Sequence, residues 1–350
     1  MSYLRKTISI LAIVIIAITT FLFGCEDLFE PSVEITDEAF LEALIAQGID
    51  ADGDSIISKV EAKSVTDLNV GPPEEDAYYF RGKIESLSGI EEFKNLESLN
   101  CSHNRLKELI IKECSKITTL DCSYNQLTSL DVSDLPLYDL YCYGNEISVL
   151  DLSSNEELLN LKCGRQDEPI RLAISNCKKL RTIYANGINN INVNNQPDLK
   201  ELGVGYSELT SLNVTNNVAL KELYIFSTNI SSINLSKNTA LRKLYLNYLL
   251  DFSGELDLSK NTELLRLRCS NCRLTELDVS NNTHLVHLDC SWNQLSQLDI
   301  SNNTELEYIS LHDMPSISKV CVWTMPFPPE GVDVSDLYSP NIYFTTECRK

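Results

Sequence analysis

The sequence has few of the residues on which most enzymes and nucleic-acid-binding proteins depend. Its 350 residues include four histidines and 13 glycines, and they contain no Gly-x-Ser-x-Gly, no His-Glu-x-x-His and no phosphate-binding glycine loop. Lys and Arg number 29 against 50 Asp and Glu, so the net charge is −21, without any basic cluster. Phosphate recognition needs clustered basic side chains, which argues against nucleic acid as a partner. These absences predict a protein that is not an enzyme.

The chain opens with a targeting segment. Two basic residues precede an uncharged apolar run over residues 8–23, which is shorter than the ~20 residues that a membrane-spanning helix needs. The run ends in Leu-Phe-Gly-Cys25, which resembles a bacterial lipobox. The resemblance implies a lipoprotein signal peptide over residues 1–24, a lipidated Cys25 and a tether over residues 25–32. We therefore expect an outer membrane lipoprotein at the cell surface or the periplasmic face, attached to the membrane only through its lipid; an ordinary cleaved signal peptide is the alternative.

Internal repeats dominate the rest of the chain. A unit of about 21 residues begins eleven times, at Leu96, Ile117, Leu137, Leu158, Leu180, Leu199, Leu220, Leu241, Leu264, Leu285 and Leu306. Apolar residues recur at unit positions 1, 4, 6, 11, 14 and 16, so each half of a unit alternates as a strand does. One unit cannot bury six apolar side chains alone, so we predict a solenoid of stacked units, with two short strands each and ~4.8 Å between neighbouring strands.

These units resemble the bacterial leucine-rich repeat class with 21 residues and two Leu-x-x-Leu-x-Leu halves. The resemblance covers residues 84 to about 320, and residues 84–96 resemble the entry repeat of such proteins. It implies a β-rich leucine-rich repeat solenoid over residues 84–320. Members of the class are binding proteins and are seldom enzymes, although membership does not name a ligand.

The repeat register also accounts for most of the 12 cysteines. Six occupy the inward position 6, namely Cys101, Cys122, Cys142, Cys163, Cys269 and Cys290. We predict that they are free thiols that pack as small apolar side chains. Cys269 and Cys272 have the spacing of half a zinc or redox motif, which is the alternative, but no second Cys pair follows at zinc-finger spacing. Cys272 lies at position 9, where other units carry Asn, and leucine-rich repeats place Asn or Cys there to bond the turn backbone. In the β-rich C-terminal cap expected over residues 321–350, Cys321 and Cys348 are predicted to form a disulfide, which export permits.

Residues 33–83 are predicted to form a small helical N-terminal cap and a loop. A helix is expected to begin at Thr36 or Asp37 and to lead into an acidic segment over residues 50–61. That segment resembles an EF-hand calcium loop whose ligands would be Asp50, Asp52, Asp54, Ile56, Ser58 and Glu61. Ser55 stands where the pattern has Gly for its turn, so we expect weak Ca²⁺ binding, near ~10⁻⁴ to 10⁻³ M. The alternative is an acidic loop between two short helices without a metal.

Aromatic residues mark the surface that we expect to bind a ligand. Positions 3, 5, 7 and 8 of each unit should face the concave side, and nine of the 15 tyrosines lie at these positions. The predicted ligand-binding residues are Tyr141, Tyr143, Tyr184, Tyr206, Tyr224, Phe226, Tyr245 and Tyr248. Exposed aromatic rings give a protein partner a large contact area and also stack on sugar rings. The alternative is that aromatics favour strands and pack on one another across them.

The function predicted from these features is that of a non-catalytic, monomeric binding protein of the bacterial cell envelope. It would recognise a protein partner through the concave aromatic face, as an adhesin or receptor does. A carbohydrate-capturing surface module is the alternative, and a structural envelope protein without a specific ligand is the third possibility. The Asp residues that recur at position 15, such as Asp131 and Asp299, are interpreted as a solvated column that discourages aggregation, with weak divalent-cation binding as the alternative.

Overall fold

The computed structural model describes residues 31–72, 82–164, 169–253 and 255–348. Residues 1–24, Cys25 and most of the expected tether lie outside this part of the chain, so the signal peptide and lipid anchor remain predictions. Within the described residues, no helix has the length and apolar character needed to cross a bilayer.

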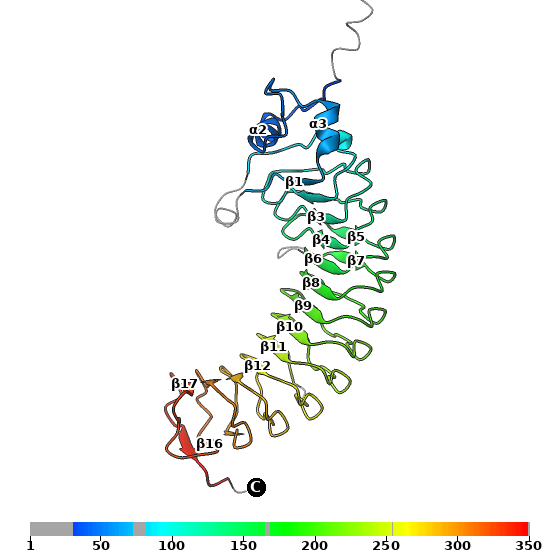
Figure 1. Ribbon diagram of the computed structural model, residues 1–350. Coiled ribbons are helices and arrows are strands. Elements are labelled where there is room, and N and C mark those ends of the chain that lie inside the picture. The colour runs from blue at the N-terminus through cyan, green and yellow to red at the C-terminus, as the bar shows by residue number, and fades with distance from the viewer. Residues whose placement is uncertain (1–30, 73–81, 165–168, 254, 349–350) are drawn as a thin grey trace, which may run out of the picture.

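The described residues form a curved solenoid, and one parallel sheet follows its inner side (Figure 1). Each coil contributes one strand to this sheet, which has 13 strands in the described part of the chain. In spatial order the strands are β1 (Asp67–Asn69), β2 (Ser98–Asn100), β3 (Thr119–Asp121), β4 (Asp139–Tyr141), β6 (Asn160–Gly164), β8 (Thr182–Asn186), β9 (Glu201–Gly205), β10 (Glu222–Phe226), β11 (Lys243–Asn247), β12 (Arg266–Arg268), β13 (His287–Asp289), β15 (Tyr308–Ser310) and β17 (Asp333–Ser335).

The register of the sheet follows the sequence repeat. The position 4 residue of each unit pairs with the position 4 residue of the next, as Leu99 does with Leu120 and Leu223 with Leu244. The apolar residues at positions 4 and 6 are buried in every unit, including the six position 6 cysteines. The predicted solenoid is therefore confirmed, because stacking the repeats buries the apolar side chains that a single unit would expose.

The second half of the repeat differs from the expectation of two strands per unit. In the described residues it forms only β5 (Val149–Asp151), β7 (Arg171–Ala173), β14 (Gln297–Asp299), β16 (Lys319–Cys321) and β18 (Tyr343–Thr345). Curvature explains the difference, since coils that are one strand spacing apart on the inner side fan out on the outer side (Figure 1). Most second halves are then too far from their neighbours to bond as a ladder.

The position 15 aspartates close turns in this outer half. Asp131 Oδ1 accepts hydrogen bonds from the amide and the hydroxyl of Ser133, at 3.1 and 2.8 Å, and Asp299 Oδ1 does the same with Ser301. Asn213 occupies the same position and accepts from Thr215. These contacts are Asx turns, so the column has a local structural role besides its charge.

Two columns of buried amide side chains bond neighbouring coils. At position 9, Asn125 Nδ2 donates to the carbonyls of Cys101 and Cys122, both at 3.0 Å, while its Oδ1 accepts from the Leu106 amide at 3.0 Å. Three residues before most of the units, a second column donates in the same way but leaves its side-chain oxygens without a partner in the described residues. Its members are Asn155, Gln196, Asn217, Asn238, Asn261, Asn282 and Asn303.

Each end of the core is covered by a short cap. At the N-terminus, α2 (Glu38–Ala46) buries Phe40 and Leu44, and its cap residue Asp37 also accepts from the backbone amides of Glu85 and Ser86. The helix α3 (Lys59–Ser64) follows, and η1 (Ile90–Glu92) lies at the entry of the array. β1 shows that the sheet begins within residues 33–83, before the repeats assigned from the sequence.

The C-terminal cap continues the solenoid instead of only closing it. β17 adds a strand to the inner sheet beside β15, and β18 pairs with β16. Phe327 packs against Trp323 and Phe344, with ring centroids 5.2 and 4.9 Å apart. The structure contains a Cys321–Cys348 disulfide with Cα atoms 5.7 Å apart, which ties the last strand to the array.

Candidate functional site

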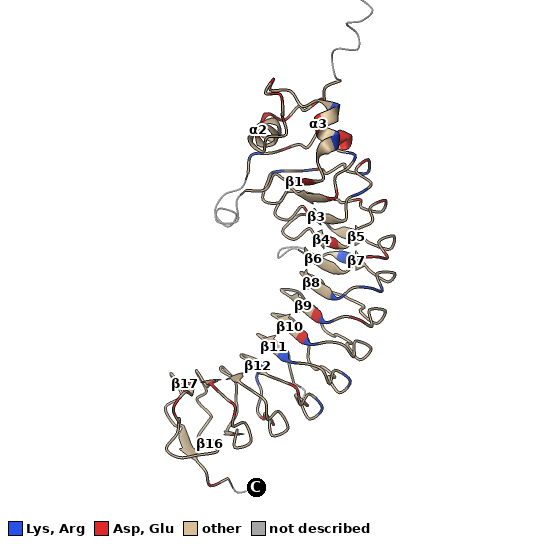
Figure 2. Cartoon of the chain, viewed as in Figure 1, with Lys and Arg blue, Asp and Glu red and all other residues tan. Residues whose placement is uncertain are grey.

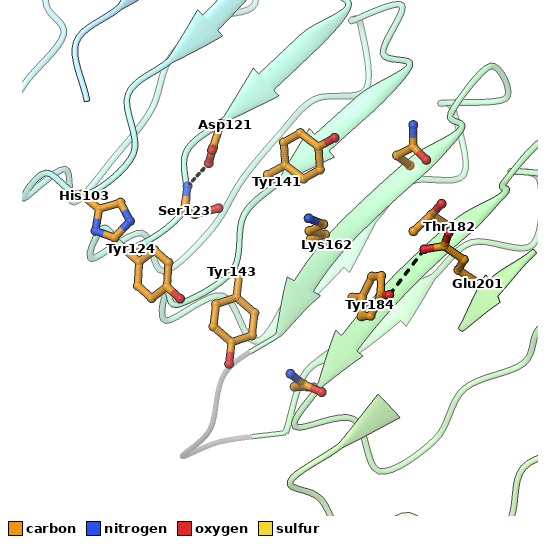
Figure 3. A pocket seen from close by; sticks show the side chains of 12 residues that line it. His103, Asp121, Ser123, Tyr124, Tyr141, Tyr143, Lys162, Thr182, Tyr184 and Glu201 are labelled. Carbon is orange, nitrogen blue, oxygen red and sulfur yellow. Dashed lines mark hydrogen bonds between the residues drawn. The ribbon is translucent and has the colours of Figure 1, made fainter. Parts of the chain in front are cut away.

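A groove of about 730 Å³ opens on the inner face of the sheet, over β3, β4, β6, β8 and β9. Figure 3 shows its lining, in which tyrosines and polar side chains project from neighbouring strands. Three of the predicted ligand-binding residues, Tyr141, Tyr143 and Tyr184, line this groove, together with Tyr124 and Lys162. Tyr141, Lys162 and Tyr184 lie side by side because all three occupy position 5 of adjacent, paired strands.

Lys162 is the central cation of the groove. Its Nζ lies 5.3 Å from the centroid of the Tyr141 ring and 5.9 Å from that of Tyr184, so the ammonium sits between two aromatic faces. No salt bridge joins Lys162 to a carboxylate of the described residues. An anionic group on a ligand could therefore pair with this ammonium between the two rings.

A missing side chain in the next strand creates the space for Tyr184. Gly203 lies beside Tyr184 in the sheet, and a Cβ atom at Gly203 would come within 2.4 Å of Tyr184 Cδ1. The ring therefore lies over the glycine, and its hydroxyl donates to Glu201 at 3.4 Å. Burial and the charges of Glu201 and Glu222 raise the pKa of Tyr184 to about 12, so the phenol stays neutral.

The other position 5 aromatics mainly contact one another. The Tyr224 ring centroid lies 6.0 Å from that of Tyr184 and 5.1 Å from that of Tyr245, while Phe226 stacks on Tyr224 at 6.4 Å. The Arg268 guanidinium lies over Tyr245 at 5.0 Å. Cross-strand packing thus accounts for part of the aromatic column, as the alternative in the sequence analysis proposed.

The charge on the same face changes from acidic to basic along the sheet. Figure 2 shows acidic residues on β9 and β10 followed by basic residues on β11. Lys243 Nζ bonds Glu222 at 2.8 Å, and the Tyr224 hydroxyl donates to the same carboxylate. Burial raises the pKa of Glu222, but the hydrogen bonds from Lys243 and Tyr224 outweigh it and lower the pKa overall.

Tyr206 and Tyr248 lie away from the groove. Both follow the strands at position 8, on the rim of the sheet, and are 50% and 58% exposed. Trp292 occupies the same position and is as exposed, although we did not include it among the predicted ligand-binding residues. We also omitted Lys162, because its importance depends on the rings of adjacent coils.

The acidic loop has the arrangement expected of a cation site. One carboxylate oxygen from each of Asp50, Asp52 and Asp54 lies within 4.8 Å of the others. Ser55 adopts a left-handed φ of 68°, the conformation for which the pattern prefers Gly. Glu61 accepts instead from the Ala51 and Ser58 amides and forms the capping box of α3.

Electrostatics in this loop reflect its crowding. The hydrogen bond from the Asp54 amide lowers the pKa of Asp52, but desolvation and the charges of Asp54, Glu61 and Asp50 outweigh it and raise the pKa. A bound cation would offset the neighbouring negative charges that raise the pKa of Asp52. The oxygen donors therefore fit a hard cation such as Ca²⁺.

The buried thiols have the properties of core side chains. Cys272 Sγ donates to the Leu246 carbonyl at 3.0 Å, which is the bond that Asn provides at this position in other coils. Burial raises the pKa of Cys272 to about 11 and that of Cys163 to about 12. Thiols with such a pKa stay protonated and react poorly with oxidants or metals.

Comparison with known proteins identifies the scaffold. A family model of leucine-rich repeats, two copies, matches residues 94–137. An internalin from Listeria monocytogenes, InlF, is 18% identical over 92% of this chain and 99% of that chain, with a TM-score of 0.69. The fold is a leucine-rich repeat solenoid. A leucine-rich repeat protein from Leptospira interrogans is similar as well, at 20% identity over 73% of this chain and 69% of that chain, with a TM-score of 0.59.

The leucine-rich repeat fold is suited to binding because its curved sheet presents an extended concave surface. The groove and the aromatic column both lie on that surface. A search of curated protein sequences finds no match to this chain.

Proposed function

We propose that this chain is a non-catalytic binding protein of the bacterial cell envelope, anchored by a lipid at Cys25, that recognises a protein partner through the concave groove. The observation that carries this proposal is the groove itself, where Lys162 lies between Tyr141 and Tyr184. Tyrosine is among the residues that dominate the energetics of protein interfaces.

The groove favours a partner that presents a carboxylate beside an apolar side chain. The carboxylate would pair with Lys162, and the apolar group would pack on the faces of Tyr143 and Tyr184. A charge pair that is shielded by rings is stronger than one in open water, because fewer water molecules compete for it. Glu201 and Asp121 at the margins would disfavour a wholly acidic partner.

A site-specific cross-linking experiment tests this proposal. We would place a photoreactive phenylalanine at Tyr143 in cells of the source bacterium and with host proteins, and identify captured proteins by mass spectrometry. Tyr138 is the matched control position, because it is 45% exposed and does not line the groove. We expect a protein that is captured from Tyr143 but not from Tyr138.

Two substitutions show whether capture depends on the groove. Lys162→Met removes the charge, and Gly203→Ala forces the Tyr184 ring to move while it keeps every lining side chain. Both should reduce capture, since each alters the space between the two rings. Equal capture by both variants would contradict the proposal, and elution of the partner by free oligosaccharides would favour the carbohydrate alternative. Absence of any captured protein would favour a structural envelope protein.

We also propose that the acidic loop binds Ca²⁺ as a structural ligand of the N-terminal cap. Asp50, Asp52, Asp54 and the Ile56 carbonyl would hold the ion, with Ser58 and Glu61 completing the set. Added Ca²⁺ should raise the melting temperature of the intact protein, whereas Asp52→Asn should remove the shift. An identical shift with Asp52→Asn would show that the stabilisation arises elsewhere.

A further inference from the structure

A row of exposed aromatic side chains follows one rim of the concave sheet, outside the groove. Tyr206, Tyr248 and Trp292 share position 8 and are 50%, 58% and 57% exposed. The ring contacts of the central concave face join Tyr184, Tyr224, Phe226 and Tyr245, and none involves these three side chains in the part of the chain that the structure describes. Mutual packing therefore does not explain their presence.

The backbone at position 8 disfavours such residues. Tyr206, Tyr248 and Trp292 have φ values of 52°, 58° and 58°, in the left-handed region. Position 8 is left-handed in the other described coils as well, at His103, Tyr124, Gly144, Gly187, Ser227, Asn271 and Asp313. Glycine and asparagine adopt this conformation readily, whereas a bulky side chain there is an outlier. Strained residues of this kind concentrate at functional sites.

The three rings are regularly spaced. The Tyr206 amide donates to the Phe226 carbonyl at 2.9 Å, and the amides of Tyr248 and Trp292 donate to the corresponding carbonyls of their next coils at 3.1 and 2.9 Å. Ser227 and Asn271, on the coils between them, make the same bond at 3.0 Å. Adjacent coils are thus one strand spacing apart at this rim, so the backbone positions that carry successive rings are about 10 Å apart.

The resulting order along the rim is aromatic, small polar, aromatic, small polar, aromatic. We infer that this row binds an extended neutral β-1,4-linked glycan. Alternate sugars stack on Tyr206, Tyr248 and Trp292, while Ser227 and Asn271 bond the hydroxyls of the sugars between them. Flat aromatic faces suit the apolar faces of sugar rings.

The geometry of the glycan explains the spacing. In a β-1,4-linked chain each sugar is turned by about half a turn relative to the last, so the same ring face recurs at every second sugar. That repeat is close to two strand spacings of the solenoid. A globular protein surface offers no such repeat, and the net charge of −21 disfavours polyanionic glycans.

Binding of defined oligosaccharides to the intact protein tests the inference. Cellohexaose, chitohexaose and xylohexaose would be titrated by calorimetry and by tryptophan fluorescence. Trp323 packs against Phe327 in the C-terminal cap, so Trp323→Phe leaves Trp292 as the only fluorescent tryptophan. We expect at least one hexaose to bind and to shift the Trp292 emission to the blue, whereas failure of all three to bind would overturn the inference.

Asparagine substitutions remove the rings without disturbing the turn, because Asn271 has the same backbone conformation. Tyr248→Asn should weaken binding about tenfold, as expected for the loss of one stacked ring, and the triple variant with Tyr206→Asn and Trp292→Asn should not bind. Circular dichroism should show that both variants remain folded. Unchanged affinity in the triple variant would refute the site.

A matched variant tests the spacing itself. Tyr248→Asn combined with Ser227→Tyr keeps three rim aromatics but moves the middle ring by one coil. We expect it to bind as weakly as Tyr248→Asn alone, and wild-type affinity would refute the repeat match. Tyr184→Ala, in the groove, should leave glycan binding unchanged, so this test and that of the concave protein site can fail independently.

Discussion

The position 9 asparagines offer a quantitative test of how the coils are held together. In Asn125→Ala, the carbonyls of Cys101 and Cys122 keep other donors, from Asn104 and Asn145. The Leu106 amide loses its bond to Asn125 Oδ1 and is left buried without a partner. An orphaned buried amide costs about 1–3 kcal/mol.

Asn238→Ala is the matched control because Asn238 is also buried and its amide also donates to backbone carbonyls, those of Val214 and Asn217. Its Oδ1 has no partner in the described residues, so the substitution orphans no amide. Both variants lose the same volume, and the cavity terms largely cancel. We expect Asn125→Ala to reduce the free energy of unfolding by about 2 kcal/mol more than Asn238→Ala does.

Urea unfolding followed by circular dichroism measures this difference, and hydrogen exchange reports the local effect. The Leu106 amide should lose its protection in Asn125→Ala but keep it in Asn238→Ala. Equal losses of stability, or a Leu106 amide that stays protected in Asn125→Ala, would refute the reasoning.

Three further predictions concern single side chains. Cys272→Asn should preserve the thermal midpoint, because Asn replaces the hydrogen bond to the Leu246 carbonyl. Cys272→Ala should lower the midpoint, since loss of that bond reduces the free energy of unfolding by about 1 kcal/mol. The hydrogen bonds from the Ser133 hydroxyl and amide lower the pKa of Asp131. Their contribution to stability is present above the unfolded pKa and is lost as pH falls through the folded pKa. Asp131→Asn should therefore reduce the fall of the urea midpoint below pH 4. Burial raises the pKa of Tyr184 to about 12, whereas the unfolded value is about 10. Between pH 10 and pH 12 only the unfolded state loses the proton, so the stability of the protein should fall over this range. In Tyr184→Phe the fall of the urea midpoint should be smaller.

Sequence periodicity was sufficient to predict the solenoid and its core. Residues such as Leu99 and Cys101 recur with the spacing of an inward-facing strand, and stacking is the one arrangement that buries them all. The helix after Asp37 was predictable for a similar reason, because its cap and its buried face are local patterns. The shortage of strands in the outer half was not predictable, since it depends on curvature.

The candidate sites divide in the same way. The aromatic character of the inner face followed from repeat positions, but the groove did not, because it depends on Lys162 lying between rings of adjacent coils and on the space above Gly203. Tyr206 and Tyr248 were predicted as ligand-binding residues, but their place in a rim row with Trp292 was not predicted. Gly144, Gly187 and Asn271 at position 8 were the available signal, since these residue types tolerate a left-handed backbone.

The sequence by itself determined which side chains enter the core of this protein, because burial of a repeated apolar pattern has one solution when the units stack. It also determined which columns the aromatic residues occupy. Only the tertiary structure decided which aromatics pack on one another, which enclose a cation and which remain exposed at regular intervals. Those outcomes depend on contacts between residues about 20 apart in sequence, whose geometry is set by the spacing and curvature of the coils.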